Sequence, residues 1–388
     1  MTARNHRNSA RRYDIDWLRI FVIVLLFPFH SARIFDVWEP NYVKNIDLSW
    51  GLSWFIIIVG YWFMPLMFWL SGASSWYALQ SKNALQYVKE RMSRLFIPLL
   101  FGILIIVPPQ GYLAKLSTPG YDQTYFQFLT SYFRDFSDLS GYFGTFTPAH
   151  LWFILYLLIY SLIGLPLLLA LKKEGSRKRF ARFWSTFSKP WAYLLGFIFL
   201  TATEALPAPG GKNPFFFFFI FIAGYITCAD ERFDTMIHRL KSKALLFLLP
   251  CLSLYLLLLP KLAGLPDWSP ESIMLAFLRN LVLWLTLIVI WGYGQKYLNF
   301  SSKWLAYMNQ AAFPIYVIHQ TVLLTIGFFV VRLGLGWGPK FLGIMVLSFF
   351  SCIVIYDLVI RRFDITRWMF GVKEGSAPKA KGKQINEK

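Results

Sequence analysis

The sequence has little charge and few cysteines for its length. Only 15% of its 388 residues are Asp, Glu, Lys or Arg, whereas soluble domains have about a quarter. The three cysteines, Cys228, Cys251 and Cys352, show neither a Cys-x-x-Cys spacing nor a Cys/His pattern. These shortages argue against an ordinary soluble domain, a disulfide framework and a metal site.

Long apolar runs are abundant instead. Hydrophobic residues make up 56% of the chain and aromatic residues 19%. A run of about 20 apolar residues is long enough to cross a bilayer. The pattern predicts an all-α polytopic integral membrane protein with about ten transmembrane helices, at 17–36, 52–79, 92–111, 150–171, 190–206, 214–229, 244–262, 272–293, 311–332 and 338–360. The second run is long enough to be tilted or broken at Pro65.

Lysine and arginine gather in alternate connections between these runs. One set of connections holds most of them, in basic clusters at 4–12, 82–94, 172–189, 232–243 and 361–388. The positive-inside rule places this set, and with it both termini, in the cytoplasm. The net charge of +19 is therefore explained by membrane topology and does not indicate a nucleic-acid partner.

The first predicted helix carries an arginine and a histidine inside its apolar run. Arg19 and His30 are eleven residues apart, which places them roughly 20° apart around a helix and about 16 Å apart along it. Ionisable groups inside a bilayer are costly, so this alignment predicts a polar channel within the bundle. Pro28 frees the carbonyl of Val24 and is expected to kink the helix beside His30.

Two interpretations of His30 follow from the residues alone. A neutral imidazole can deprotonate a hydroxyl, which is the proton transfer that acyl transfer requires. Alternatively, His30 is a core histidine that donates to a neighbouring carbonyl.

The start of the third run adds two more arginines. Arg91 and Arg94 are spaced i, i+3 and share a helix face, and they would lie at the same depth as Arg19. Three guanidinium groups suit a polyanionic ligand, because arginine binds phosphates bidentately. The alternative is that these arginines anchor the helix to lipid phosphates.

Together these features resemble the membrane-bound acyltransferase family 3, which includes O-antigen acetylases and glucan-modifying succinyltransferases. Arg19-x10-His30 is similar to the family's R/K-X10-H motif, and Arg91-x-x-Arg94 is similar to its R-X-X-R motif. Weaker matches are Phe68-Trp69-Leu70-Ser71-Gly72, His150-Leu151-Trp152-Phe153 and Phe313-Pro314-Ile315-Tyr316-Val317-Ile318-His319. The resemblance spans essentially the whole chain.

One departure from the family pattern affects the choice of branch. Many relatives that acetylate O-antigen carry a carboxylate shortly after the H-x-W segment, whereas here the next residues are Leu155, Tyr156, Leu157 and Leu158. This difference casts doubt on a histidine–carboxylate dyad at this point and favours the glucan-modifying branch.

The resemblance implies an O-acyltransferase with no permanently bound cofactor. Its co-substrate would be a cytoplasmic acyl-CoA, either acetyl-CoA or succinyl-CoA, and its acceptor an extracytoplasmic glycan or other cell-envelope hydroxyl. His30 would be catalytic, with Arg19 of the same motif, and the donor contacts would be Arg19, Arg91 and Arg94. Substrate contacts are expected from His150, Trp152, His319 and Ser71. A packing role for His319 and an interfacial one for His150 stay open.

The expected organisation is simple. Residues 1–16 would form a basic cytoplasmic N-terminus, 17–361 the transmembrane acyltransferase domain, and 362–388 a basic cytoplasmic tail that is disordered after 371. The protein would be integral to a bacterial cytoplasmic membrane.

A second hypothesis is a transporter of an anionic metabolite or lipid-linked sugar through the same basic passage, although clear acidic relays or paired broken helices are missing from the sequence. Near a span end, Asp357 and Arg361 are spaced as a helix-surface pair.

Overall fold

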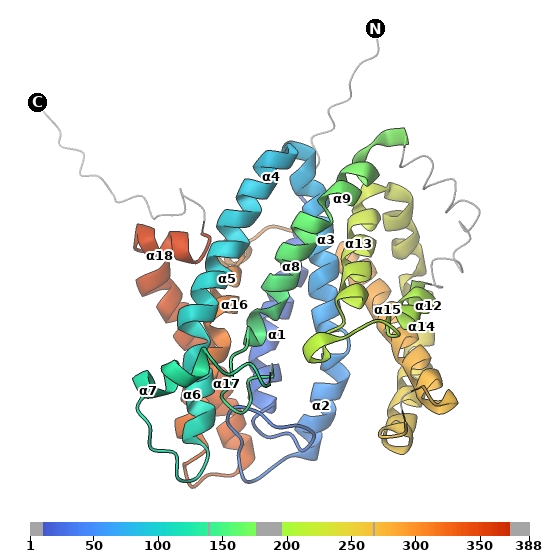
Figure 1. Ribbon diagram of the computed structural model, residues 1–388. Coiled ribbons are helices and arrows are strands. Elements are labelled where there is room, and N and C mark those ends of the chain that lie inside the picture. Colours follow the sequence, from blue (N-terminus) through green and yellow to red (C-terminus); the bar gives the residue numbers. More distant parts are fainter. Residues whose placement is uncertain (1–10, 139, 176–195, 267, 373–388) are drawn as a thin grey trace, which may run out of the picture.

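The chain folds as a bundle of helices lying side by side (Figure 1). The computed structural model describes residues 11–138, 140–175, 196–266 and 268–372, and within them it has helices and no strands. Eight helices in these residues are long and apolar enough to cross a membrane, or nine crossings if one bent pair is included. The prediction of an all-α polytopic membrane protein is confirmed, and the cytoplasmic placement of the termini stays a prediction.

Among the described residues up to 175 there are nine α-helices. They are α1 (Tyr13–Ala32), α2 (Trp50–Gly60), α3 (Phe63–Ser81), α4 (Ala84–Arg91), α5 (Ile97–Phe101), α6 (Pro108–Leu116), α7 (Tyr125–Tyr132), α8 (Trp152–Ile163) and α9 (Leu165–Lys172). The second half contains α12 (Gly196–Thr203), α13 (Pro214–Ala229), α14 (Glu231–Leu262), α15 (Pro270–Tyr297), α16 (Lys303–Val330), α17 (Trp337–Ile355) and α18 (Asp364–Met369). The predicted span 190–206 lies partly outside the described residues, and its described part includes α12.

Several helix ends differ from the predicted spans. The second span is broken, but the break lies at Tyr61 and Trp62, and Pro65 belongs to the first turn of α3, where a proline is tolerated. The fourth span bends by 57° between α8 and α9. Helix α14 begins at Glu231, well before residue 244, because the Asp230 side chain accepts from the backbone of the first turn and caps it.

The third span contains two wide turns. Met92–Phe96 and Gly102–Ile106 are π-helical segments, called η1 and η2, that alternate with α4, α5 and α6. At the end of η2, the Val107 amide donates to the Gly102 carbonyl, five residues back, at 2.9 Å. Wide turns of this kind are frequent at functional sites.

Helices α1 and α16 form the interior of the bundle. Half of the apolar window of α1 and 56% of that of α16 is buried, against 11% for α14. Helix α1 packs against α16 and α17, and also contacts α2, α3 and α15. Helix α14 pairs with α15 at the right-hand edge of Figure 1 and turns large apolar side chains outward. The motif of the first span therefore lies in the centre of the protein.

Helices α3 and α13 approach each other through two glycines. A Cβ atom added to Gly72 would lie 1.9 Å from the carbonyl oxygen of Phe221, and one added to Gly224 would lie 2.0 Å from that of Trp69. Only glycine permits such a close approach of two backbones, as is common in membrane helix pairs.

One end of the bundle carries an ordered loop at 33–49. Asp36 is fully buried and pairs with Arg33 at 3.0 Å and with Lys44 at 3.2 Å. Burial lowers the pKa of the Lys44 ammonium, and the Asp36 carboxylate beside it opposes that shift. We call this the outer end and the opposite end, where α4 begins, the inner end, following the charge pattern of the sequence (Figure 1).

Candidate active site

A cavity of about 1050 Å³ lies between α1, α3, α8, α13, α15 and α16 and extends to the outer-end loops. The α1 residues that line it, from Leu26 to His30, belong to the outer half of that helix, and Arg33 follows directly after the helix end. A cavity of this size is large enough for a substrate of several rings.

Three histidines from separate helices meet at this cavity. The ring centroids of His30 and His319 are 5.2 Å apart, and those of His319 and His150 are 5.0 Å apart. His30 belongs to α1, His319 to α16, and His150 to the short helical turn that precedes α8. Within the described residues no group of three His, Cys, Asp or Glu side chains could hold a metal ion, this histidine cluster included.

Hydrogen bonds fix His150 and His319 in defined orientations. His150 Nε2 donates to the Val317 carbonyl at 2.9 Å, so that Nδ1 is left to accept from the Gln110 amide at 3.4 Å. His319 Nδ1 donates to the Tyr316 carbonyl at 2.6 Å. His319 Nε2 is buried and has no hydrogen-bond partner in the described part of the chain.

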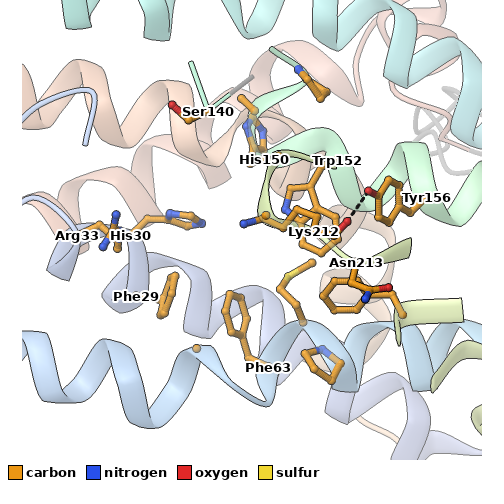
Figure 2. Close-up of a pocket in the computed structure, with 18 of the residues that line it drawn as sticks. Phe29, His30, Arg33, Phe63, Ser140, His150, Trp152, Tyr156, Lys212 and Asn213 are labelled. Atoms are coloured by element: carbon orange, nitrogen blue, oxygen red, sulfur yellow. Dashed lines mark hydrogen bonds between the residues drawn. The ribbon is translucent and has the colours of Figure 1, made fainter. Parts of the chain in front are cut away.

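His30 is the least enclosed of the three. Its side chain is half-buried, and its ring points into the cavity toward the side chain of Lys212 (Figure 2). The structure therefore gives His30 access to a molecule in the cavity, as a general base requires.

Aromatic side chains form one wall of the cavity. The centroid of the Trp152 ring lies 5.0 Å from that of Phe217, 5.5 Å from that of Tyr156 and 5.8 Å from that of Phe68. Phe68, from the segment that ends in Ser71-Gly72, is fully buried behind this wall. Flat apolar rings of this kind suit the faces of a sugar or another cyclic molecule.

The cavity holds one unneutralised cation in the part of the chain that the structure describes. Arg33 pairs with acidic side chains of the following loop, and Arg279 pairs with Glu204 at 2.5 Å. Lys212 has no carboxylate within ion-pair distance, and its Nζ lies 5.8 Å from the centroid of Trp152. The backbone of Lys212 is held in place, because its carbonyl accepts from the Tyr156 hydroxyl at 2.8 Å (Figure 2).

The arginines of the sequence motifs gather toward the inner end. Arg19 donates to Ser74 at 2.8 Å and to Asp16 at 3.1 Å. Arg91 donates to Ser75 at 3.1 Å, and its guanidinium lies 4.6 Å from the ring centroid of Tyr87. Because Ser74 and Ser75 are consecutive on α3, the structure brings Arg19 and Arg91 to the same level of the bundle.

The positions of Arg94 and Ser71 give less support to a role in binding substrate. Arg94 pairs with Glu90 at 3.5 Å, one turn earlier in the same helical segment. The Ser71 hydroxyl donates to the Met67 carbonyl at 2.8 Å, as serines inside membrane helices commonly do. In the described chain neither these residues nor Arg19 and Arg91 line the cavity. A continuous passage from the arginines to His30 therefore stays a prediction.

Sequence reasoning missed three polar contributors to this site. Lys212 lies in a connection that holds few basic residues, and it belongs to none of the sequence motifs. Arg279 and Asn280 lie in the cavity wall on α15. An arginine inside an apolar run is a sequence signal that could have placed Arg279 in the site. The predicted helix-surface pair of Asp357 and Arg361 is confirmed at 2.7 Å.

Comparison with known proteins identifies the family. The acyltransferase domain family that the sequence motifs suggested matches residues 12–357, nearly the whole chain. The chain belongs to the acyltransferase 3 family. It is therefore a membrane-bound enzyme that transfers acyl groups other than amino-acyl groups.

Curated relatives of this acyltransferase include proteins named glucans biosynthesis protein C. Those of Salmonella paratyphi B, Salmonella agona and Salmonella dublin are each 24% identical over 346 residues, which cover 83% of this chain and 85% of the relative. No solved structure matches the chain significantly.

Proposed function

We propose that this acyltransferase moves an acetyl or succinyl group from a cytoplasmic acyl-CoA to a hydroxyl of an extracytoplasmic glycan, with His30 as general base. The observation that carries the proposal is the position of His30, which faces a large, aromatic-walled cavity that extends to the outer loops. The enzyme would need no permanently bound cofactor.

The outer part of the site supports a glycan acceptor. Trp152 and its neighbouring rings offer flat apolar surfaces, and Glu204 with Arg279 and Asn280 adds planar polar groups to the same cavity. Sugars present alternating apolar faces and hydroxyl edges, which such a lining can bind. The relatives are named for glucan biosynthesis, which favours a glucan among the possible cell-envelope acceptors.

The inner end supports an anionic acyl donor. Arg19 and Arg91 meet at Ser74 and Ser75, and Arg94 lies one helical turn beyond Arg91. Coenzyme A carries several phosphates, and arginine is the side chain best suited to bind them. We propose that these guanidinium groups bind the phosphates while the thioester end extends along α1 toward His30.

The reaction then needs one proton transfer and one bond exchange. His30 accepts the proton of the acceptor hydroxyl as the oxygen attacks the thioester carbonyl, and a new C–O ester bond forms. The C–S bond then breaks, and the protonated imidazole returns the proton to the leaving thiolate, so that charge and protons balance. The Lys212 ammonium would stabilise the negative oxygen of the tetrahedral intermediate, since it is the cavity's unpaired cation among the described residues.

The proposed setting is the cytoplasmic membrane of a bacterium. Residues 17–361 would form the catalytic unit within the bilayer, between a basic N-terminal segment and a basic tail on the cytoplasmic side. Acyl-CoA would approach from the cytoplasm and the glycan from the opposite side.

Reconstituted vesicles test the proposal. Acyl-CoA labelled in the acyl group is enclosed with the purified protein in the membrane, and an oligoglucan is supplied outside. Label bound covalently to the external glucan supports the enzyme. Label that crosses as an intact small molecule, with no ester formed, would instead support a transporter of anionic metabolites. A vesicle in which neither occurs, with the protein correctly folded and inserted in both orientations, would count against this donor and acceptor.

A further inference from the structure

Three polar side chains form a hydrogen-bonded cluster in the cavity wall. Glu204 follows α12 directly, and Arg279 and Asn280 lie on α15. The Arg279 guanidinium and the Asn280 amide both donate to Oε1 of Glu204, the amide at 2.8 Å. The same amide also donates to the Thr201 hydroxyl at 3.1 Å. The Glu204 carboxylate is therefore held in one orientation by donors from a neighbouring helix.

Two acceptor atoms of this cluster have no donor within the described residues. Oε2 of Glu204 receives no hydrogen bond there, and 23% of that side chain is exposed. Oδ1 of Asn280 is buried without a partner, in a residue that is only 1% exposed. Buried polar atoms normally have partners. Unpaired acceptors in a cavity wall therefore point to a ligand that donates hydrogen bonds.

The charges of the cluster favour a neutral ligand. The Glu204 carboxylate is paired with Arg279, so the attraction and the repulsion that an ion would feel nearly cancel. Arg279 donates only to Glu204 in the described chain, which leaves further guanidinium N–H groups beside the free carboxylate oxygen. A hydroxyl both donates and accepts, so adjacent hydroxyls of a sugar match this arrangement of donors and acceptors.

Glu204 lies across the cavity from His30. The Asn213 side chain donates to two backbone carbonyls of the segment 203–206, at 2.7 and 3.2 Å, and so holds that segment. In Figure 2, Asn213 lies on the opposite side of the cavity from His30, with the Trp152 ring between them. One sugar ring is about as wide as one aromatic ring, so a ligand that contacts both His30 and Glu204 needs at least two sugar rings.

We infer that Glu204, Arg279 and Asn280 form a second sugar subsite, which binds a ring next to the one that reacts at His30. Glu204 is then a specificity residue, and the preferred acceptor is a chain of at least two sugars. The inference rests on the proposed function, in which a sugar hydroxyl is acylated at His30. It adds to that function a preference for longer acceptors.

Acceptor length tests the subsite. Transfer in vesicles is compared for methyl glucoside and for a glucan of three sugars, as kcat/KM per sugar ring. The wild-type value should be about 10- to 100-fold higher for the longer acceptor, which is the worth of a hydrogen bond to a charged group.

A variant of Glu204 and a matched control assign this factor to the subsite. In Glu204→Gln the amide oxygen must face the donors of Arg279 and Asn280, so an NH2 group takes the place of Oε2. This variant should lose most of the factor on the longer acceptor and much less on methyl glucoside. Asp357→Asn removes another carboxylate paired with an arginine, outside the cavity lining, and should keep the wild-type ratio.

Equal losses on both acceptors in Glu204→Gln, or a wild-type enzyme that does not distinguish acceptors by length, would overturn the subsite. An altered acceptor covers the case in which Glu204→Gln does not fold. A disaccharide that lacks the hydroxyls of its non-reacting ring should react about 10- to 100-fold more slowly with the wild-type enzyme. Undiminished transfer to this disaccharide would refute the inference. A wild-type enzyme that acylates no glucan of any length would instead refute the proposed function.

Discussion

Replacing Gly72 by alanine tests how tightly the α3–α13 contact holds the site together. The new methyl group would lie 1.9 Å from the Phe221 carbonyl oxygen, whereas an ordinary contact begins at 3.4 Å, so the two backbones must separate by about 1.5 Å. Overpacking against an immovable backbone costs about 1–3 kcal/mol, and the lost close contact between the helices adds about 0.5–1 kcal/mol. The higher helix propensity of alanine returns about 1 kcal/mol. The free energy of unfolding should therefore fall by about 0.5–3 kcal/mol.

The assay is equilibrium unfolding in mixed micelles, with Gly51→Ala as the matched control. A Cβ at Gly51 meets only the Ser49 hydroxyl at 3.7 Å, so that variant should be at least as stable as the wild type. Because α3 also carries Ser74 and Ser75, Gly72→Ala should raise KM for the acyl donor. If Gly72→Ala proves as stable as the wild type and as Gly51→Ala, the close contact of α3 with α13 does not exist as described.

Variants of His30, of the Arg91 and Arg94 pair, and of Lys212 address the proposed chemistry. His30→Ala should lower turnover by about 10²- to 10⁴-fold while the protein still inserts in the membrane, and near-normal turnover in vesicles would remove His30 from catalysis. Arg91→Ala combined with Arg94→Ala should raise KM for acyl-CoA far more than KM for the glycan; an equal rise in both would assign the pair to folding or lipid anchoring. Lys212→Gln should lower kcat by about 10²-fold, and Lys212→Arg should restore much of it. A change in Lys212→Gln limited to KM for the acceptor would contradict the role of this ammonium in stabilising the oxyanion.

The sequence predicted the spans and their motifs because those depend on local patterns. Apolar length located most crossings, and the arginine and histidine of the first motif lie on one helix, α1, as their eleven-residue spacing required. Helix ends were less accurate. Some helices, such as α14, begin with polar turns that precede the apolar run. A prediction based on apolar length does not include those turns.

The meeting of the three histidines could not be worked out from the chain alone. His30, His150 and His319 come from α1, the turn before α8, and α16. Only the packing of those helices brings the rings of His30 and His150 each within about 5 Å of the ring of His319, between centroids. Lys212 lies in the cavity because the Tyr156 hydroxyl donates to its backbone carbonyl and holds the loop in place. No sequence pattern predicts that contact. Arg279 was predictable in principle, because a charged residue in an apolar span signals a buried partner.

The wide turns of the third span determine which residues face His150. Each π-helical segment adds one residue to a turn, so each rotates everything after it by about 100° relative to a regular helix. After η2 the backbone N–H of Gln110 donates to the Val107 carbonyl. This leaves the Ile106 carbonyl free to accept from the Thr321 hydroxyl at 2.6 Å. The Gln110 side chain in turn donates to Thr321 at 2.7 Å and reaches His150. Deleting one residue from Gly102–Ile106 would thus shorten the helix by only one residue. It would nevertheless rotate Gln110 about the helix axis and away from the histidine cluster.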